Sequence, residues 1–258
     1  MKTRTQNEPW SKDELIVAFN LYCKTPFPKI NSTNKGIMEL SSIIKRSPSS
    51  VALKLANFAR LDPVLRERHI SGMSHGSKGE IDVWEEFASN WEELAYQSEL
   101  ILAKFKHEPV ETSAGINEEG LPKEGRERPA LVKVRVNQAF FRKTVLASYD
   151  NKCCITGLSI PYLLVASHII PWATDLKNRL NPCNGLCLNA LHDKAFDLGL
   201  ITITPEYRIL LAKSLKRKNP VNDAFFIPYE YSNVSLPQKF LPARDFLEFH
   251  NKHIYVDR

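Results

Sequence analysis

The spacing of apolar residues predicts three short helices within the first sixty or so residues. Between Ser11 and Lys24, four apolar residues recur at three- and four-residue spacing behind a serine that can cap the helix. Similar stripes predict helices over residues 35–45 and 48–61. In the turn between these two, Ser47 and Pro48 suit an N-cap followed by proline at the first helical position. The pattern indicates a helix-turn-helix, with a plain three-helix bundle as the alternative.

A helix-turn-helix would place its second helix in the DNA major groove. On the predicted helix over residues 48–61, Lys54, Asn57 and Arg60 carry side chains that can reach phosphates or base edges. We therefore take these three residues as candidate DNA contacts.

Aromatic and aliphatic residues between glutamates predict one long connecting helix over residues 81–106. Its acidic face suits a scaffold or a protein interface better than a DNA surface. Residues 107–130 are polar, contain Gly and Pro and lack any period, which indicates a linker. The expected organisation is a helical DNA-binding domain over residues 1–106, a linker over 107–130 and a second domain over 131–258.

The distribution of charge along the chain bears on whether the protein binds nucleic acid. The net charge is +6, and residues 1–60 hold ten Lys and Arg against four Asp and Glu, whereas residues 61–110 hold five against ten. Basic segments favour a polyanion such as nucleic acid, because neutralised phosphates release counterions, although solvated surface explains them equally well. No signal peptide or membrane span is evident in the sequence, so we expect a cytoplasmic protein without a membrane partner.

The second domain shows a strand, a polar loop, a second strand and a helix, after a predicted helix over residues 137–149. The first strand ends at His168, and the last helix opens near His192. Such a ββα unit can bring the two histidines close around one divalent cation. An imidazole can accept a proton from water at neutral pH, so His168 is the candidate general base and His192 the candidate metal ligand.

These segments also resemble a known family. RVNQAFFRKTVLASYDNKCCITG, ASHIIPW and NPCNGLCLNALHDKAFDLGLITI look like the HNH (ββα-metal) nuclease domain of restriction-type endonucleases, over roughly residues 131–258. The resemblance implies a catalytic motif of His168, Asn184 and His192, with Asn184 holding the loop and orienting the catalytic histidine. The segment ELSSIIKRSPSSVALKLANFARLDP similarly resembles the part that precedes HNH domains in bacterial restriction endonucleases, which favours a DNA-reading role.

The sequence departs from the family pattern at two places. Ser167 stands where many members carry a metal-binding aspartate. Asp193 and Asp197 on the predicted helix, or Asp175 in the loop, could supply the missing carboxylate, and Ser167 and Asp197 are taken as the further candidate metal ligands. A structural hydrogen-bonding role is the alternative for Asp197. The cysteines lack paired zinc-knuckle spacing, so we expect reduced, buried thiols and no structural zinc. Mg²⁺ is the expected cation, with Mn²⁺ or another divalent ion as alternatives.

The sequence thus predicts an α+β protein, with a helical, helix-turn-helix-like N-terminal domain and a C-terminal HNH domain that hydrolyses DNA in restriction or defence. Lys177, Arg179 and Lys194 flank the expected cleft and are candidate phosphate contacts, with solvated surface as the alternative. Two other functions stay open: a catalytically inactive DNA-binding regulator, and a nuclease toxin or RNase controlled by a partner. DNA is the expected partner, and a homodimer would suit a palindromic cut.

Overall fold

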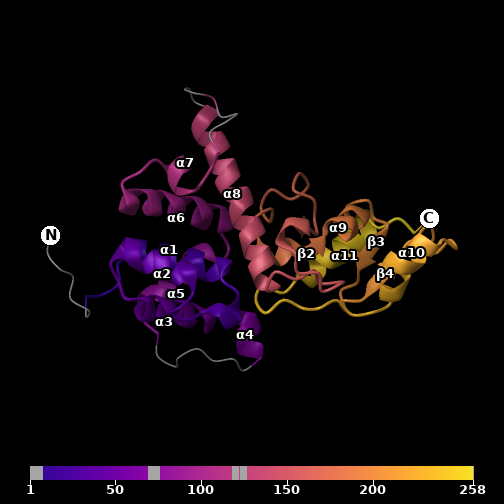
Figure 1. Ribbon diagram of the computed structural model, residues 1–258, viewed down its shortest axis with the longest axis horizontal. Helices are drawn as coiled ribbons and strands as arrows, with labels where there is room; N and C mark the ends of the chain where they lie inside the picture. Colours follow the sequence, from indigo (N-terminus) through magenta and orange to yellow (C-terminus); the bar gives the residue numbers. More distant parts are fainter. Residues whose placement is uncertain (1–7, 69–75, 118–121, 123–126, 258) are drawn as a thin grey trace. The chain divides into compact units, whose positions relative to one another are not determined.

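A computed structural model describes residues 8–68, 76–117, 122 and 127–257. The chain divides into two compact units, unit 1 over Met1–Thr144 and unit 2 over Val145–Arg258 (Figure 1). Unit 1 is helical where it is described, and unit 2 combines helices with two small antiparallel sheets, so the protein mixes helix and sheet. Within the described ranges, we find no helix with the length and apolar character that a membrane crossing requires.

Unit 1 consists of helices where it is described, and capping residues in the sequence mark the starts of α1 and α3. Its α-helices are α1 (Lys12–Lys24), α2 (Lys35–Ile44), α3 (Pro48–Ala59), α4 (Pro63–Glu67), α5 (Lys78–Phe87), α6 (Trp91–Lys106), α7 (Val110–Ser113) and most of α8 (Glu127–Ser148), with a 3₁₀ turn over Phe27–Lys29. Ser11 forms a capping box with Glu14 at α1, and the Ser47 hydroxyl accepts from the Ser50 amide at α3. The three predicted helices of the first sixty residues are confirmed.

The prediction of one long helix over residues 81–106 is wrong. Helix α5 ends at Phe87 and α6 begins at Trp91, and Asn90 between them leaves the helical conformation with φ −132° and ψ 61°. Asn favours helix ends because its side chain competes for backbone hydrogen bonds. Phe87 and Trp91 are both buried and four residues apart, so the apolar period continues across the break and could not reveal it.

The segment expected as a linker, residues 107–130, carries secondary structure where it is described. Helix α7 lies within it, and α8 starts at Glu127. The two compact units divide inside α8, between Thr144 and Val145.

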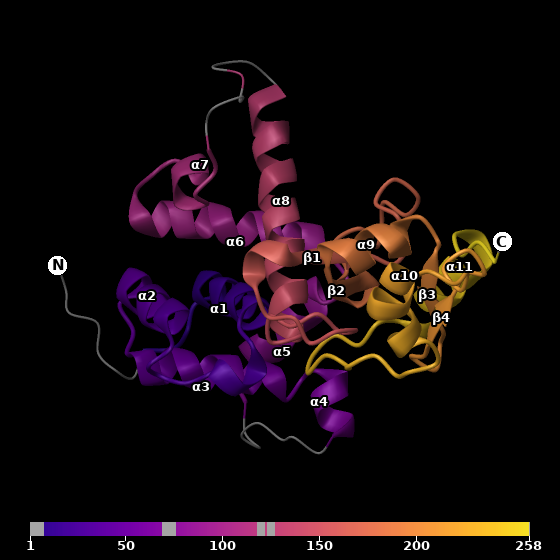
Figure 2. The ribbon, with the colours of Figure 1, turned by 45° about the vertical axis from the view of Figure 1, so that its right-hand side comes forward.

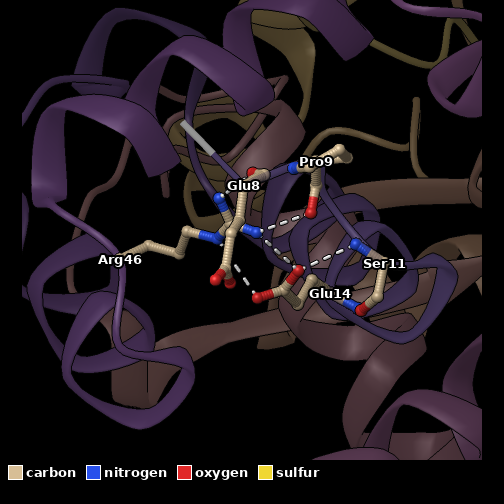
Figure 3. A network of polar contacts seen from close by, with 5 residues as sticks. All are labelled: Glu8, Pro9, Ser11, Glu14 and Arg46. Carbon is tan, nitrogen blue, oxygen red and sulfur yellow. Dashed lines mark hydrogen bonds and ion pairs between the residues drawn. The ribbon is translucent and has the colours of Figure 1, made fainter. Parts of the chain in front are cut away.

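The turn between α2 and α3 is fastened to the start of α1 by Arg46 (Figure 3). Its guanidinium binds both carboxylate oxygens of buried Glu14, at 3.2 and 3.0 Å, and donates to the carbonyl oxygens of Glu8 at 2.7 Å and Pro9 at 2.9 Å. The second Glu14 oxygen also accepts from the Ser11 amide. The one arginine of this turn is therefore engaged inside unit 1, where it holds three segments together.

The candidate DNA contacts Lys54, Asn57 and Arg60 are engaged inside unit 1. The structure directs all three toward Glu80 of α5, whose side chain is fully buried: Lys54 and Asn57 donate to one carboxylate oxygen, and Arg60 lies 3.5 Å from the other. Burial alone would raise the pKa of Glu80, but hydrogen bonds from Lys54 and Asn57 outweigh it and the pKa is lowered. These residues join α3 to α5, because a buried carboxylate needs compensating donors.

We expect Glu80→Gln to lower the free energy of unfolding by roughly 2 kcal/mol, because it leaves two partly buried cations without their counter-charge. Urea denaturation would measure the loss, with Glu85→Gln on the exposed side of the same helix as the matched control. Equal denaturation midpoints for the two variants would contradict a supporting role for Glu80.

Unit 2 contains the predicted strand-strand-helix arrangement, which is confirmed (Figure 2). Its regular elements are β1 (Leu164–His168), β2 (Gly185–Asn189), α9 (Ala190–Asp197), β3 (Ile201–Ile203), β4 (Ile209–Leu211), α10 (Pro220–Phe225) and α11 (Arg244–His253), with 3₁₀ turns over Pro161–Leu163, Pro182–Asn184 and Ile227–Tyr229. Strands β1 and β2 pair antiparallel, and β3 pairs with β4. Helix α9 packs on β1, β2 and β3, so its side chains can meet those at the end of β1.

Candidate active site

Asn184 holds the loop that follows β1. The hairpin register places His168 opposite Gly185, so Asn184 lies beside the residues that leave the strand. Its fully buried amide accepts from the Ile170 N–H at 2.8 Å and donates to the carbonyl oxygens of Ile170 at 3.1 Å and Asn178 at 3.3 Å. One side chain thus ties both ends of the loop together, which is the geometry expected of a positioning asparagine.

His168, the last residue of β1, is oriented by that same loop. Its Nε2 lies 2.9 Å from the carbonyl oxygen of Arg179, and its ring meets Trp172 edge-on at 5.5 Å. A carbonyl oxygen can only accept, so Nε2 carries the proton of the neutral ring and Nδ1 is the basic nitrogen. Burial lowers the pKa of His168, against smaller raising effects from the Arg179 carbonyl and Asp193. The ring is therefore neutral, and able to accept a proton, at neutral pH.

The loop side chains complete this support. Asp175 accepts from the amides of Lys177 at 3.0 Å and Asn178 at 3.1 Å, and from the Asn178 side chain at 2.7 Å. These hydrogen bonds, chiefly the one from the Asn178 side chain, lower the pKa of Asp175. Asp175 therefore stabilises the turn of the loop. The Arg179 guanidinium stacks over Trp172 at 5.1 Å, whereas Lys177 is exposed. Of these two candidate phosphate contacts, only Lys177 is directed to solvent.

His168 opens onto a hollow of about 450 Å³, which we call the His168 hollow. Strand β1 contributes Ser167 and His168 to its lining, and α9 contributes Asp193 and Asp197. The two aspartates are four residues apart, so they share one face of the helix. The structure therefore brings two carboxylates to the candidate base.

The surroundings of both carboxyl groups disfavour their negative charge. Burial is the main cause that raises the pKa of Asp193, and the nearby negative charge of Asp197 raises it further, against opposing effects of Ser167 and His168. Burial also raises the pKa of Asp197, against Lys194. A cation between the carboxylates would relieve this repulsion. The buried Ser167 hydroxyl lies near Asp193 without reaching hydrogen-bond geometry.

The donor set of the His168 hollow suits Mg²⁺. Among the described residues, no three His, Cys, Asp or Glu side chains are grouped as a ready metal site. Mg²⁺ retains several waters and commonly binds through one or two carboxylates together with substrate phosphate oxygens. Asp193 and Asp197 can therefore hold such an ion, with Ser167 as a weak neutral donor beside them.

His192 is not in the His168 hollow. Its Nδ1 lies 3.0 Å from the side-chain oxygen of Asn189 and its Nε2 lies 3.1 Å from the carbonyl oxygen of Phe225. It lines a second hollow, on another face of α9. His168 and His192 therefore line different hollows, because consecutive helix residues point about 100° apart and Asp193 takes the direction toward the His168 hollow.

Asp193 joins Asp197 as a candidate ligand because both residues line the His168 hollow. The signal was present in its four-residue spacing from Asp197, the spacing that places two ligands on one helix face. The family motif by itself implies His192 as the metal ligand.

His250 of α11 is a buried core residue that also lines the His168 hollow. Its Nε2 donates to the Phe196 carbonyl at 3.2 Å, its Nδ1 accepts from the Thr202 hydroxyl at 2.8 Å, and its ring stacks on Phe196. Burial lowers its pKa to about 4 from an ordinary value of 6.5. The ring is therefore neutral down to mildly acidic pH.

This pKa predicts an acid-labile unit 2. The unfolded chain binds a proton at His250 near pH 6.5 and the folded chain only near pH 4, so His250 favours folding fully above pH 6.5 and progressively less as the pH falls toward 4. The expected loss is about 2 kcal/mol between pH 7 and pH 5. Urea midpoints of unit 2 at both pH values would measure it. His250→Asn should flatten the pH dependence and exposed His253→Asn should not; equal slopes in all three proteins would contradict this role.

The cysteines of unit 2 belong to its core. Cys153, Cys154 and Cys187 are buried, Cys183 is partly exposed, and none of them is bridged. Burial raises the pKa of the Cys154 thiol, which keeps it protonated. Packing accounts for these side chains.

Comparison with known proteins identifies a family for one segment of the chain. A search of curated proteins finds no significant match to the chain. A family model described as HNH endonuclease matches residues 153–204, the stretch that holds β1, β2 and α9 together with His168, Asn184 and both aspartates. The C-terminal part of this chain therefore contains an HNH endonuclease domain.

Proposed function

We propose that this protein is a metal-dependent endonuclease that hydrolyses DNA phosphodiester bonds in the His168 hollow. The observation that supports it is the convergence of an oriented, neutral imidazole with two carboxylates on one helix face, inside the segment that matches HNH endonucleases. General-base hydrolysis of a phosphodiester requires these two components within one site.

In this mechanism, His168 Nδ1 accepts a proton from the attacking water while the Arg179 carbonyl holds the other side of the ring. Asp193 and Asp197 would hold the divalent cation, which would supply charge neutralisation at the scissile phosphate and the leaving oxygen when bound. Asn184 keeps the loop, and with it the Arg179 carbonyl, in register with His168. His192 is a structural residue at the start of α9.

The carboxylates of α9 also bear on the rival interpretation of an inactive DNA-binding regulator. That rival rests on Ser167 in place of the family's aspartate. Asp193 and Asp197 lie on the same hollow as Ser167 and can provide the negative charge that Ser167 lacks. This favours an active enzyme.

Contacts to the substrate outside the hollow are part of the same proposal. Lys177 and Lys194 are exposed and can contact phosphates, and Arg179 adds the charge of its stacked guanidinium. In unit 1, the α2–turn–α3 segment can serve as a DNA-reading module through exposed Ser49, since Lys54, Asn57 and Arg60 are engaged with Glu80. Restriction of foreign DNA is the biological setting that this combination suits.

Supercoiled plasmid incubated with Mg²⁺ or Mn²⁺ tests the proposal. We expect nicked and linear products that depend on the added cation, are abolished by a chelator and appear with DNA rather than RNA as substrate. The absence of nicking with every divalent cation, together with retained DNA binding, would instead support the regulator. Preferential cleavage of RNA would support the ribonuclease alternative.

A further inference from the structure

The hollow that His192 lines has the character of a binding site for an uncharged ring. It has a volume of about 570 Å³ and lies between the start of α9, residues 156–163 and the segment from α10 to Tyr229. Most of its lining is apolar, and Leu163, Leu191 and Phe225 expose between 46% and 51% of their surface. None of its described lining residues is Lys, Arg, Asp or Glu. An occupant would therefore be apolar or aromatic, and not a phosphate.

The polar groups that line this hollow are held in place by hydrogen bonds. His192 is fixed by Asn189 and by the Phe225 carbonyl, and Tyr229 meets its ring edge-on at 5.5 Å. The Asn189 amide also donates to the Thr156 hydroxyl at 3.3 Å. An apolar wall with a few fixed polar groups is the combination that binds a planar heterocycle.

The position of the second hollow on α9 indicates which planar heterocycle it could bind. His192 and Asp193 are consecutive residues, yet they line different hollows, so the two hollows occupy different faces of one helix. An α-helix with its side chains is about 10 Å wide. One strand of B-DNA advances about 3.4 Å per nucleotide, so a strand with a phosphate in the His168 hollow passes the second hollow within about three nucleotides.

We propose that the second hollow binds a nucleobase of the cleaved strand within three nucleotides of the scissile phosphate, which makes it a base-stacking subsite beside the candidate active site. This inference rests on the proposed nuclease function. Bases stack on aromatic side chains whatever their sequence, and Phe225 offers the exposed ring for it. A base in this hollow has left its own helix, so an unpaired or mismatched base at that position binds better than a paired one.

Cleavage of plasmid by the wild-type protein, followed by sequencing of the ends, fixes the scissile position. Binding is then measured with the cleavage-deficient His168→Ala protein and duplexes that carry one abasic nucleotide at each of the three positions on either side. We expect one position at which the abasic substitution weakens binding by about tenfold. In the double variant with Phe225→Ala, the same substitution should weaken binding less than twofold, because the stacking partner is already absent.

Two further variants keep this test decisive. Tyr231→Ala removes an exposed aromatic ring of unit 2 outside the hollow and should leave the abasic effect unchanged. Leu191→Trp fills the hollow from its rim. It should likewise remove the sensitivity of binding to the abasic nucleotide, and it provides this test even if Phe225→Ala does not fold. The subsite would be overturned if the abasic nucleotide weakened binding equally with and without Phe225, or if no position were sensitive to it. Continued nicking of plasmid by the wild-type protein would then leave the nuclease function standing. Failure of nicking itself would overturn the nuclease function instead.

Discussion

His168→Ala is expected to lower the rate of DNA cleavage by about 10³-fold while changing DNA affinity less than twofold. Different groups carry catalysis and binding. The imidazole removes a proton in the transition state, whereas the cation and exposed lysines hold the phosphates. Single-turnover cleavage of plasmid, with binding measured separately, distinguishes the two effects.

The matched control for this variant is His253→Ala. That histidine is exposed and lies outside the His168 hollow in the same unit, so its loss should leave the cleavage rate unchanged. If the His168 variant cleaves at the wild-type rate, the assignment of the general base is wrong. If both variants lose activity equally, the effect reflects folding of unit 2 rather than proton transfer.

Asp197→Asn and Asp193→Asn are expected to lower cleavage by about 10²-fold each at a fixed Mg²⁺ concentration, with partial recovery at higher concentration. Each change removes half of the negative charge that holds the cation. Without metal, the same variants should be at least as stable as the wild type, because burial raises the pKa of both carboxyls and the negative charge of Asp197 raises that of Asp193 further. Loss of activity combined with retained stability identifies groups that serve function rather than folding.

His192→Ala separates this assignment from the one that the family motif suggested. It removes a buried ring that lies 3.1 Å from the Phe225 carbonyl oxygen and 3.0 Å from the Asn189 side-chain oxygen, so it should lower the stability of unit 2 and leave the Mg²⁺ concentration for half-maximal cleavage unchanged. Titrations of Mg²⁺ with the three variants measure the difference. A shifted Mg²⁺ requirement for His192→Ala, together with none for the aspartate variants, would contradict the proposed ligands.

The local elements of this protein were predictable, since each rests on neighbouring residues. Ser11, Ser47 and the apolar stripes behind them specify helices through capping and burial, and the short apolar runs around Ser167 and Cys187 specify paired strands. The break before Trp91 was not predictable from the period, because the buried aromatic residues keep their spacing across it.

The candidate site was predictable in composition and only partly in geometry. His168 and Asn184 lie at the hairpin, whose register follows from the two strands. The face of α9 that meets His168 depends on how the helix packs on the sheet, and a rotation of one residue exchanges His192 for Asp193. The partners of Lys54, Asn57 and Arg60 likewise depend on Glu80, a residue remote in sequence that folding brings beneath α3.

The central claim is that one cation binds to the aspartates of α9 in the hollow of His168. Anomalous diffraction from crystals of the protein soaked in Mn²⁺ tests it most directly. The account predicts a peak at coordination distance, about 2.2 Å, from an oxygen of Asp193 or Asp197, on the side of α9 that faces His168. A peak on the imidazole of His192, with the His168 hollow empty, would contradict it.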